Sequence, residues 1–212
     1  MKAYVVSIII FFSLLLSFSC KGRQNKGKVN ELLDFYIGLK NRFPTEYSSH
    51  FPEEVNIDSS FYYSYSELEE WGIILSCSIT EKPTIDHLIT QSKFVYPADD
   101  SCQLIINRFF TEDRYNVILS AKDSSQIDRL CYLEKLPVPN FRRNIFSVGT
   151  SPSVLTSDFT LYVLGAEQGV FFQPEDKYPP NKYMPKAWKH GYSKGVAVSE
   201  EKGVAIYWIM IW

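Results

Sequence analysis

The spacing of apolar residues is helical near residue 30 and again near residue 85. In residues 29–43, VNELLDFYIGLKNRF, apolar side chains recur every three or four positions, which predicts an amphipathic helix. Asn30 suits the N-terminal cap of this helix, and Pro44 ends it. Residues 83–92 show the same period over a shorter stretch and predict a short second helix.

Strand patterns dominate the chain from residue 72 onward. Residues 204–212, VAIYWIMIW, are apolar on both faces, and we therefore expect a central strand that is covered on both sides. Gly203 suits the left-handed position of the turn before it. The strands that the pattern predicts are 72–79, a hairpin of 103–110 with 115–121, a hairpin of 158–165 with 169–173 around GAEQ, and a hairpin of 195–199 with 204–212.

Two stretches carry weaker patterns. Residues 44–70 are polar and aromatic, which predicts mainly loop with a short helix at 66–71. Residues 124–136 weakly favour a helix before Pro137. Taken together, the elements predict an α+β fold, a mainly antiparallel sheet built from hairpins, with the 29–43 helix packed on it.

The first 20 residues have the order of a secretory signal. Lys2 supplies a positive charge, and an apolar segment follows at residues 4–18, interrupted only by serines. As a helix this segment spans about 22 Å, at ~1.5 Å per residue, whereas a bilayer core needs ~30 Å. A short apolar segment of this kind is typical of a cleaved signal.

The end of this segment, Ser17-Phe18-Ser19-Cys20, resembles the signal of bacterial lipoproteins. That resemblance implies cleavage before Cys20 and lipidation of its thiol. The leucine that is usual three residues before the cysteine lies one place earlier, at Leu16. Ordinary signal peptidase would cut the same bond, so simple secretion stays open, as does an uncleaved anchor. The resemblance divides the chain into a signal at 1–19, a lipidated tether at 20–28 and one globular domain at 29–212.

The tether is basic and contains two glycines. It carries Lys21, Arg23, Lys26 and Lys28, with no acidic residue before Glu31. Bases near an anionic leaflet add attraction to a lipid anchor. Lipoproteins exported to the outer surface resemble one another in an acidic patch at this place, so we expect the outer membrane of a Gram-negative bacterium, facing the periplasm. A solvated linker without a role for its charge remains the alternative.

The composition of the globular domain, residues 29–212, bears on which kinds of partner it can bind. From residue 29 onward there are 17 basic and 24 acidic residues, which argues against nucleic acid. Hydrophobic residues at 45% and aromatic residues at 16% suffice for a core and exclude a disordered chain. We expect the membrane to be contacted through the N-terminal lipid, and we expect no cofactor.

Three cysteines remain once Cys20 is assigned to lipid. Cys77, Cys102 and Cys131 have no paired C-x-x-C spacing, so a zinc site is disfavoured and no metal site is predicted. In an oxidising periplasm the default is one disulfide and one buried thiol. The spacing does not select the pair.

One motif matches a known catalytic pattern. Gly191-Tyr192-Ser193-Lys194-Gly195 has the form G-x-S-x-G, but in α/β-hydrolases a histidine follows the serine. No histidine follows here. The motif therefore predicts a turn that leads into a strand, and we expect no catalytic residue.

The remaining polar candidates are the histidines and an acidic pair. His50, His87 and His190 each favour a surface or boundary position, because none has metal-ligand or catalytic spacing to a partner. Asp99 and Asp100 follow Pro97 and predict a turn or cap.

Residues 174–194 form the most unusual region. This stretch contains five lysines but only two acidic residues, and aromatic residues alternate with the lysines. It also contains four prolines. Such a loop is suited to a glycan or a protein partner. The alternative is that its aromatic rings cover the sheet while the lysines reach water. The candidate binding residues are Tyr178, Lys182, Tyr183, Lys186, Trp188, Lys189, His190 and Tyr192.

These observations favour a lipid-anchored protein of the cell envelope with a binding or accessory role and no catalysis. Two other classes stay open. An envelope hydrolase acting on glycan or peptide predicts a cleft where Asp99, Glu167 or His190 converge. A protective lipoprotein of the immunity type would bind a toxin or inhibitor.

Overall fold

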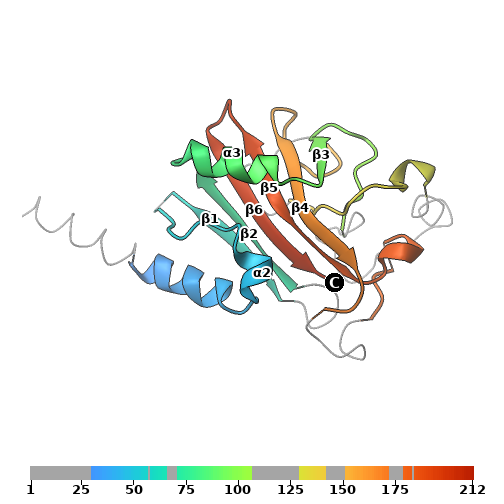
Figure 1. The fold of residues 1–212 in the computed structure, drawn as a ribbon, viewed down its shortest axis with the longest axis horizontal. Coiled ribbons are helices and arrows are strands. Elements are labelled where there is room, and N and C mark those ends of the chain that lie inside the picture. The colour runs from blue at the N-terminus through green and yellow to red at the C-terminus, as the bar shows by residue number, and fades with distance from the viewer. Residues whose placement is uncertain are drawn as a thin grey trace, which may run out of the picture.

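One six-stranded antiparallel sheet organises the chain, with strand order β1-β2-β6-β5-β4-β3 (Figure 1). The computed structural model describes residues 30–56, 58–65, 71–106, 129–141, 151–171, 179–182 and 184–212, with backbone alone at 61–65. The strands are β1 (Ser60–Tyr65), β2 (Trp71–Ser78), β3 (Phe94–Pro97), β4 (Thr160–Gln168), β5 (Gly191–Ser199) and β6 (Val204–Ile211). Residues 30–40 are helical, and the other helices are α2 (Thr45–Ser48), α3 (Lys82–Thr90), η1 (Leu130–Tyr132) and η3 (Lys186–Trp188).

Strand β6 lies inside the sheet, between β2 and β5, and all its residues are buried. Its side chains alternate between two cores because successive residues of a strand point to opposite faces. Trp208 enters one core and Tyr207 the other. The prediction of a central strand covered on both faces is confirmed.

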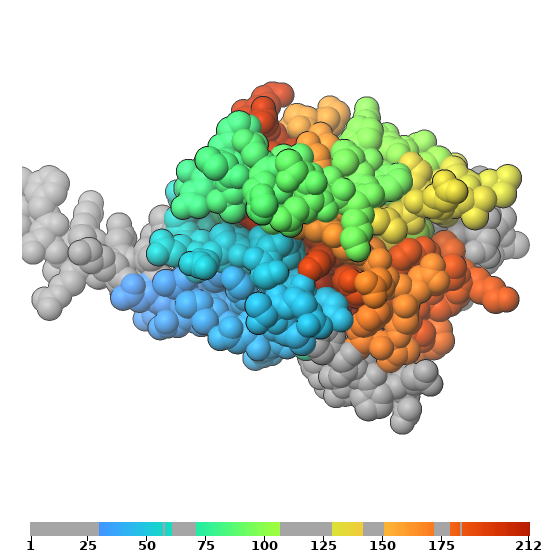
Figure 2. Space-filling view, in the orientation of Figure 1, coloured from blue at the N-terminus to red at the C-terminus, as the bar shows by residue number. Residues whose placement is uncertain are grey.

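The two cores are covered by different kinds of structure. The helix-side core joins sheet residues to Tyr36 and Leu39 of the first helix and to Ile85 and Leu88 of α3. Figure 1 shows α2 and α3 in front of the sheet, with the helix of residues 30–40 at its lower left, and Figure 2 shows these segments covering part of it. The opposite, loop-side core contains Ile74, Tyr96, Ile105, Val138, Phe141, Leu155, Phe159, Leu161, Ala197, Ile206, Trp208 and Met210, among others.

The hairpin of β5 and β6 has the turn that the sequence predicts. Ser199 pairs with Val204, and Gly203 in the turn has a φ of 63°. This left-handed conformation strains other residues but costs glycine little. The predicted strand at 72–79 and helix at 83–92 are likewise confirmed, as β2 and α3.

The predicted hairpin around GAEQ is wrong. Strand β4 continues through this segment from Thr160 to Gln168, paired with β5 throughout. The pairing register shifts between Val163 and Gly165, so the glycine belongs to a bulge and not to a turn. A bulge inserts one residue into a strand without ending it.

The structure also differs from the predicted elements in several short segments. Residues 60–65 form β1 instead of a loop, and β3 was not predicted. Residues 103–106 lie outside the strands, with one isolated bridge between Ile105 and Val138. In residues 124–136, the described part has only the short η1. The remainder of the predicted 103–121 hairpin and the predicted helix at 66–71, except Trp71 in β2, fall outside the described residues.

Candidate functional site

Two aromatic residues of the predicted binding loop are core side chains. Trp188 is 8% exposed and its ring lies 6.2 Å from that of Trp212, centroid to centroid. The indole of Trp212 also donates a hydrogen bond to the carbonyl oxygen of Trp188, at 2.8 Å. Tyr192 is buried on β5. Trp188 therefore covers the sheet from the loop side, which was the alternative that the sequence left open, whereas Tyr192 is part of strand β5 itself and faces the helix side.

The basic residues of the same loop are more accessible. Lys182 and Lys186 are exposed, and His190 is half-buried. The amine of half-buried Lys189 donates to the carbonyl oxygens of Asn181 and Lys182, at 3.1 and 3.3 Å. It thus closes the loop on itself. Tyr178 and Tyr183 lie outside the described residues.

The bulge in β4 brings Glu167 beside Tyr192. Before the bulge, Leu161 and Val163 face the loop-side core, whereas Ala166 faces that core after it. The odd-numbered Glu167 is therefore turned to the helix side, because one extra residue reverses the alternation. Its carboxylate accepts a hydrogen bond from the Tyr192 hydroxyl at 3.2 Å.

Three aromatic rings meet around this pair. The ring centroids of Tyr47 and Phe171 lie 4.9 and 4.8 Å from that of Tyr192, and both contacts are edge-to-face. Such geometry is favourable for aromatic pairs. The rings fill the space between one another, while Glu167 is exposed at their border.

A lysine completes the group. The amine of Lys194 donates to the carbonyl oxygen of Glu46. Burial and the nearby charge of Lys93 lower the pKa of Lys194, and burial together with Glu167 raises the pKa of Tyr192 to about 12. We call Tyr47, Glu167, Phe171, Tyr192 and Lys194 the aromatic–charged surface. It is the candidate binding site, because it combines ring edges with an acceptor and a donor.

Sequence reasoning singled out Tyr192 in this surface but missed Tyr47 and Phe171. Tyr47 is more than a hundred residues from its partners on β4 and β5. No local spacing could have connected them. The bulge that orients Glu167 also has no signal beyond Gly165, which favoured a turn instead.

The G-x-S-x-G segment lies within β5 and does not form a turn. Ser193 is fully buried, its hydroxyl donates to the carbonyl oxygen of Pro137 at 2.5 Å, and the indole of Trp208 donates to it at 3.1 Å. Both hydrogen bonds are structural. Ser193 thus joins β5 and β6 to the 132–141 segment on the loop side.

The acidic residues proposed for a hydrolytic cleft are divided by the length of β4. Asp99 follows β3, whose Pro97 pairs with Thr160 at the start of β4, whereas Glu167 lies near the end of β4. Seven residues of strand at ~3.3 Å each separate the two ends by about 23 Å. His190 lies at the Glu167 end, next to Gly191, which pairs with Gln168.

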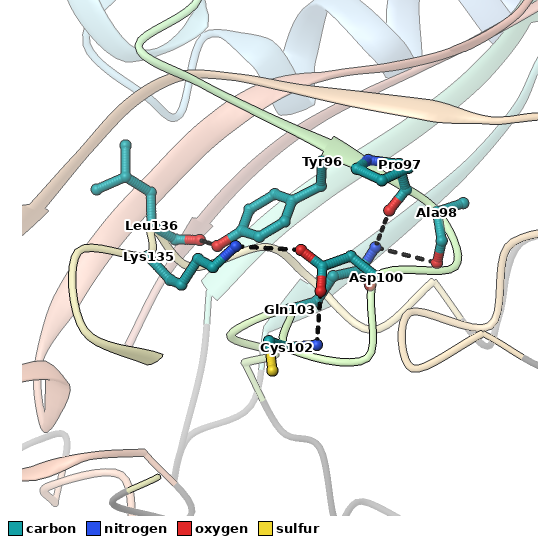
Figure 3. Close-up of polar contacts among 8 residues, drawn as sticks. All are labelled: Tyr96, Pro97, Ala98, Asp100, Cys102, Gln103, Lys135 and Leu136. Atoms are coloured by element: carbon teal, nitrogen blue, oxygen red, sulfur yellow. Dashed lines mark hydrogen bonds and ion pairs between the residues drawn. The ribbon is translucent and has the colours of Figure 1, made fainter. Parts of the chain in front are cut away.

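Asp100 forms a half-buried ion pair behind the turn after β3 (Figure 3). Its carboxylate lies 3.1 Å from the amine of Lys135 and accepts a hydrogen bond from the backbone N–H of Cys102 at 2.7 Å. The same amine lies 5.0 Å from the ring centroids of both Phe94 and Tyr96. Because the charges of Asp100 and Lys135 compensate each other, we assign this cluster a structural role. The predicted turn or cap at Asp99–Asp100 is confirmed, since the backbone N–H of Asp100 donates to the carbonyl oxygen of Pro97.

A second ion pair fastens the β5–β6 turn. The amine of Lys202 lies 2.6 Å from the carboxylate of Asp158, which also accepts a hydrogen bond from Ser199 at 2.5 Å. Burial by itself would raise the pKa of Asp158, but hydrogen bonds from Lys202, Ser199 and Thr156 outweigh it and hold the pKa well below its usual range. This arrangement stabilises the turn.

The three histidines occupy different environments. The predicted surface or boundary position is wrong for His50, which is buried at the helix-side face because its Nε2, 2.9 Å from the carbonyl oxygen of Trp208, has a hydrogen-bond partner there. His87 is exposed on α3 beside Gln91, and His190 is half-buried at the start of β5. Within the described part of the chain, no disulfide joins Cys77, Cys102 and Cys131.

Among the described residues, no group of three or more histidines, cysteines and acidic residues is placed to hold a metal ion. No helix in those same ranges is long and apolar enough to cross a membrane. No protein-family model matches the chain, and neither a curated protein nor a solved structure is significantly similar to it.

Proposed function

We propose that this chain is a lipid-anchored protein of the bacterial cell envelope whose body binds a partner without catalysis. The observation that carries the proposal is the junction at residues 17–20, Ser-Phe-Ser-Cys, after an apolar segment too short for a comfortable span. Cys20 becomes the first residue of the mature chain and carries the acyl chains. Residues 20–28 are the tether, and residues 29–212 are one domain.

The first helix connects the tether to this domain. We expect an amphipathic helix over residues 29–43 that packs on the sheet. Burial of Tyr36 and Leu39 in the same core as Ile73 supports this arrangement. The basic tether, with no acidic patch after Cys20, favours the periplasmic face of the outer membrane.

The anchor is tested by metabolic labelling with an alkyne analogue of palmitate, followed by membrane fractionation. The intact protein should be labelled and found in membranes, whereas Cys20→Ala should lose the label and its membrane retention. Cys77→Ser is the matched control, because it removes a different thiol and should remain labelled. Labelling of Cys20→Ala, or none of the parent, would exclude the lipoprotein assignment.

The binding role rests on the aromatic–charged surface and the exposed lysines of the neighbouring loop. Tyr192 is buried, but Tyr47, Phe171 and Lys194 are half-buried and Glu167 is exposed beside them, and accessible aromatic edges next to a charged acceptor suit a glycan or a protein segment. The double variant Lys182→Ala/Lys186→Ala should reduce co-sedimentation of the protein with purified peptidoglycan. Lys82→Ala, an exposed lysine on α3, is the control. Equal sedimentation of all three proteins would argue against glycan binding through this loop.

The immunity-type role is favoured by one further observation. Leu130 and Leu133 are 84% and 70% exposed, and such apolar side chains are suited to a protein contact. Cross-linking in intact cells, with the parent and with Leu130→Ser/Leu133→Ser, separates this role from glycan binding. A defined protein adduct that only the parent forms would support it. The hydrolase role would have to use Glu167 and His190 without Asp99, because β4 separates Asp99 from them.

A further inference from the structure

The sheet separates one of the three cysteines from the other two. Cys77 packs against the helix-side core, whereas Cys131 packs against the loop-side core. Cys102 belongs to the loop side, because it follows the turn after β3 and lies in the chain between Ala98 and Leu104, which are both buried in the loop-side core. A bond between Cys77 and either of the others would have to pass through the sheet.

The segments that carry Cys102 and Cys131 are held against each other. The Asp100 carboxylate links them directly, because it accepts a hydrogen bond from the backbone N–H of Cys102 and pairs with Lys135 (Figure 3). Farther along, the backbone N–H of Val138 donates to the carbonyl oxygen of Leu104 at 2.9 Å. These contacts hold residues 100–106 beside residues 132–138. Cys131 lies in η1, directly before the second segment.

Arg129 lies two residues before Cys131 in the chain. Its interaction with the Tyr132 side chain, and then the negative charge that Cys131 and Cys102 would carry as thiolates, raise the pKa of Arg129. Its guanidinium is 5.6 Å from the ring centroid of Tyr132. All three cysteines are partly exposed, so exposure does not distinguish Cys77 from the other two, and a small oxidant can reach Cys102 and Cys131. By contrast, burial raises the pKa of Cys77 to about 11, which disfavours the reactive thiolate.

We infer that Cys102 and Cys131 form a disulfide when the protein meets a thiol-disulfide oxidant, and that Cys77 remains a thiol. The thiolate of one cysteine attacks glutathione disulfide, forming a mixed disulfide and releasing one glutathione thiolate. The second protein thiolate then attacks the mixed disulfide and releases a second glutathione. The protein loses two protons and two electrons, and the glutathione disulfide gains them.

In the cell this reaction rests on the export that the proposed function includes, because such bonds persist in oxidising compartments. The bond would fasten the η1 turn to the turn after β3. It would reinforce the Asp100–Lys135 pair in the same place, which holds these segments without a covalent link.

The test uses the full-length protein, purified in detergent and equilibrated with reduced and oxidised glutathione in defined ratios. Free thiols are blocked with N-ethylmaleimide, and the protein is digested without reduction and mapped by mass spectrometry. We expect a linked peptide pair containing Cys102 and Cys131, with Cys77 modified by N-ethylmaleimide after unfolding. Cys77→Ser should give the same linked pair, and Cys102→Ser should leave Cys131 reactive.

The inference is overturned by a link to Cys77, or by Cys102 and Cys131 that are both alkylated or separately glutathionylated under the most oxidising ratio. The parent protein alone supplies these outcomes, so the test survives if Cys102→Ser does not fold. Because the oxidant is added in vitro, the pairing is measured independently of export. Loss of the Cys20 label in cells would contradict the anchor and leave this result intact.

Discussion

His50 and Trp208 are joined by a hydrogen bond inside the protein, with 2.9 Å between Nε2 of the imidazole and the carbonyl oxygen of the tryptophan. They are 158 residues apart, and Trp208 lies in the middle of β6. A neutral imidazole with its proton on Nε2 donates this bond. The pair fastens the segment after α2 to the central strand.

Acidification is expected to break this arrangement. Burial, which exceeds the opposing effect of the Trp208 hydrogen bond, together with the charges of Lys194 and Lys40, lowers the pKa of His50 to about 3 from an ordinary value of 6.5. The folded state therefore binds a proton less readily than the unfolded state. The contribution of His50 to the free energy of unfolding is fully present above about pH 6.5. It falls as the pH decreases toward 3, by about 1.4 kcal/mol per pH unit.

Urea unfolding between pH 7 and pH 4, followed by tryptophan fluorescence, measures this slope. His50→Gln keeps an amide donor without a titrating group and should show a shallower fall. His87→Gln, at an exposed position on α3, should retain the slope of the parent. Equal slopes for parent and His50→Gln would contradict the assigned role of His50.

Ser193→Ala is expected to destabilise the fold by roughly 2–3 kcal/mol. The substitution leaves the buried indole N–H of Trp208 and the carbonyl oxygen of Pro137 without the hydroxyl between them. Chemical denaturation of the variant measures the loss. The exposed Ser157 provides the control, Ser157→Ala, which should unfold as the parent does. A neutral Ser193→Ala would show that the hydroxyl is dispensable.

Two glycines should respond to alanine in opposite directions. At Gly195 a Cβ would lie 2.3 Å from the carbonyl oxygen of Tyr162 and 2.4 Å from the indole of Trp208. Gly195→Ala is therefore expected to lower the free energy of unfolding by about 1–3 kcal/mol through overpacking. Gly38, in the first helix, has no atom within 4 Å of such a Cβ. Gly38→Ala should stabilise by about 0.5–1 kcal/mol, and thermal unfolding separates the two.

Removal of Lys135 tests the half-buried ion pair. Side-chain exposure of Lys135 and Asp100 is 23% and 22%, so solvent screens this pair less than a surface pair. Lys135→Ala should cost roughly 1–3 kcal/mol, between the values for surface and buried pairs. Lys82→Ala, whose partners are Asp86 and Glu200 on the surface, should cause no measurable change in the midpoint of urea unfolding. Equal effects of both variants would place Lys135 among the surface charges.

Local periodicity correctly predicted elements whose burial is uniform or whose turn has a strict requirement. Strand β6 is apolar on both faces, and the turn before it needs the left-handed Gly203. The α3 pattern was legible because Ile85 and Leu88 are one turn apart and both buried. Each of these signals is contained in fewer than a dozen consecutive residues.

The errors arose where a residue's role depends on a distant partner. Gly165 favoured a turn, but its place opposite Lys194 makes it part of a bulge. Ser193 lies in a catalytic-looking pentapeptide, yet its partners are Pro137 and Trp208. The sequence left both a binding and a covering role open for Trp188, and its contact with Trp212 decided for the covering role.

The sequence by itself determined the acidic body, the basic tether, the signal-like start with Cys20, and the strongest helix and strand patterns. These depend on composition and on neighbours along the chain. The tertiary structure alone decided which cysteines share a side of the sheet and that Glu167 meets Tyr192 while Asp99 lies at the other end of β4. Such relations follow from strand order, register and a one-residue bulge, which long-range pairing sets and local patterns do not encode.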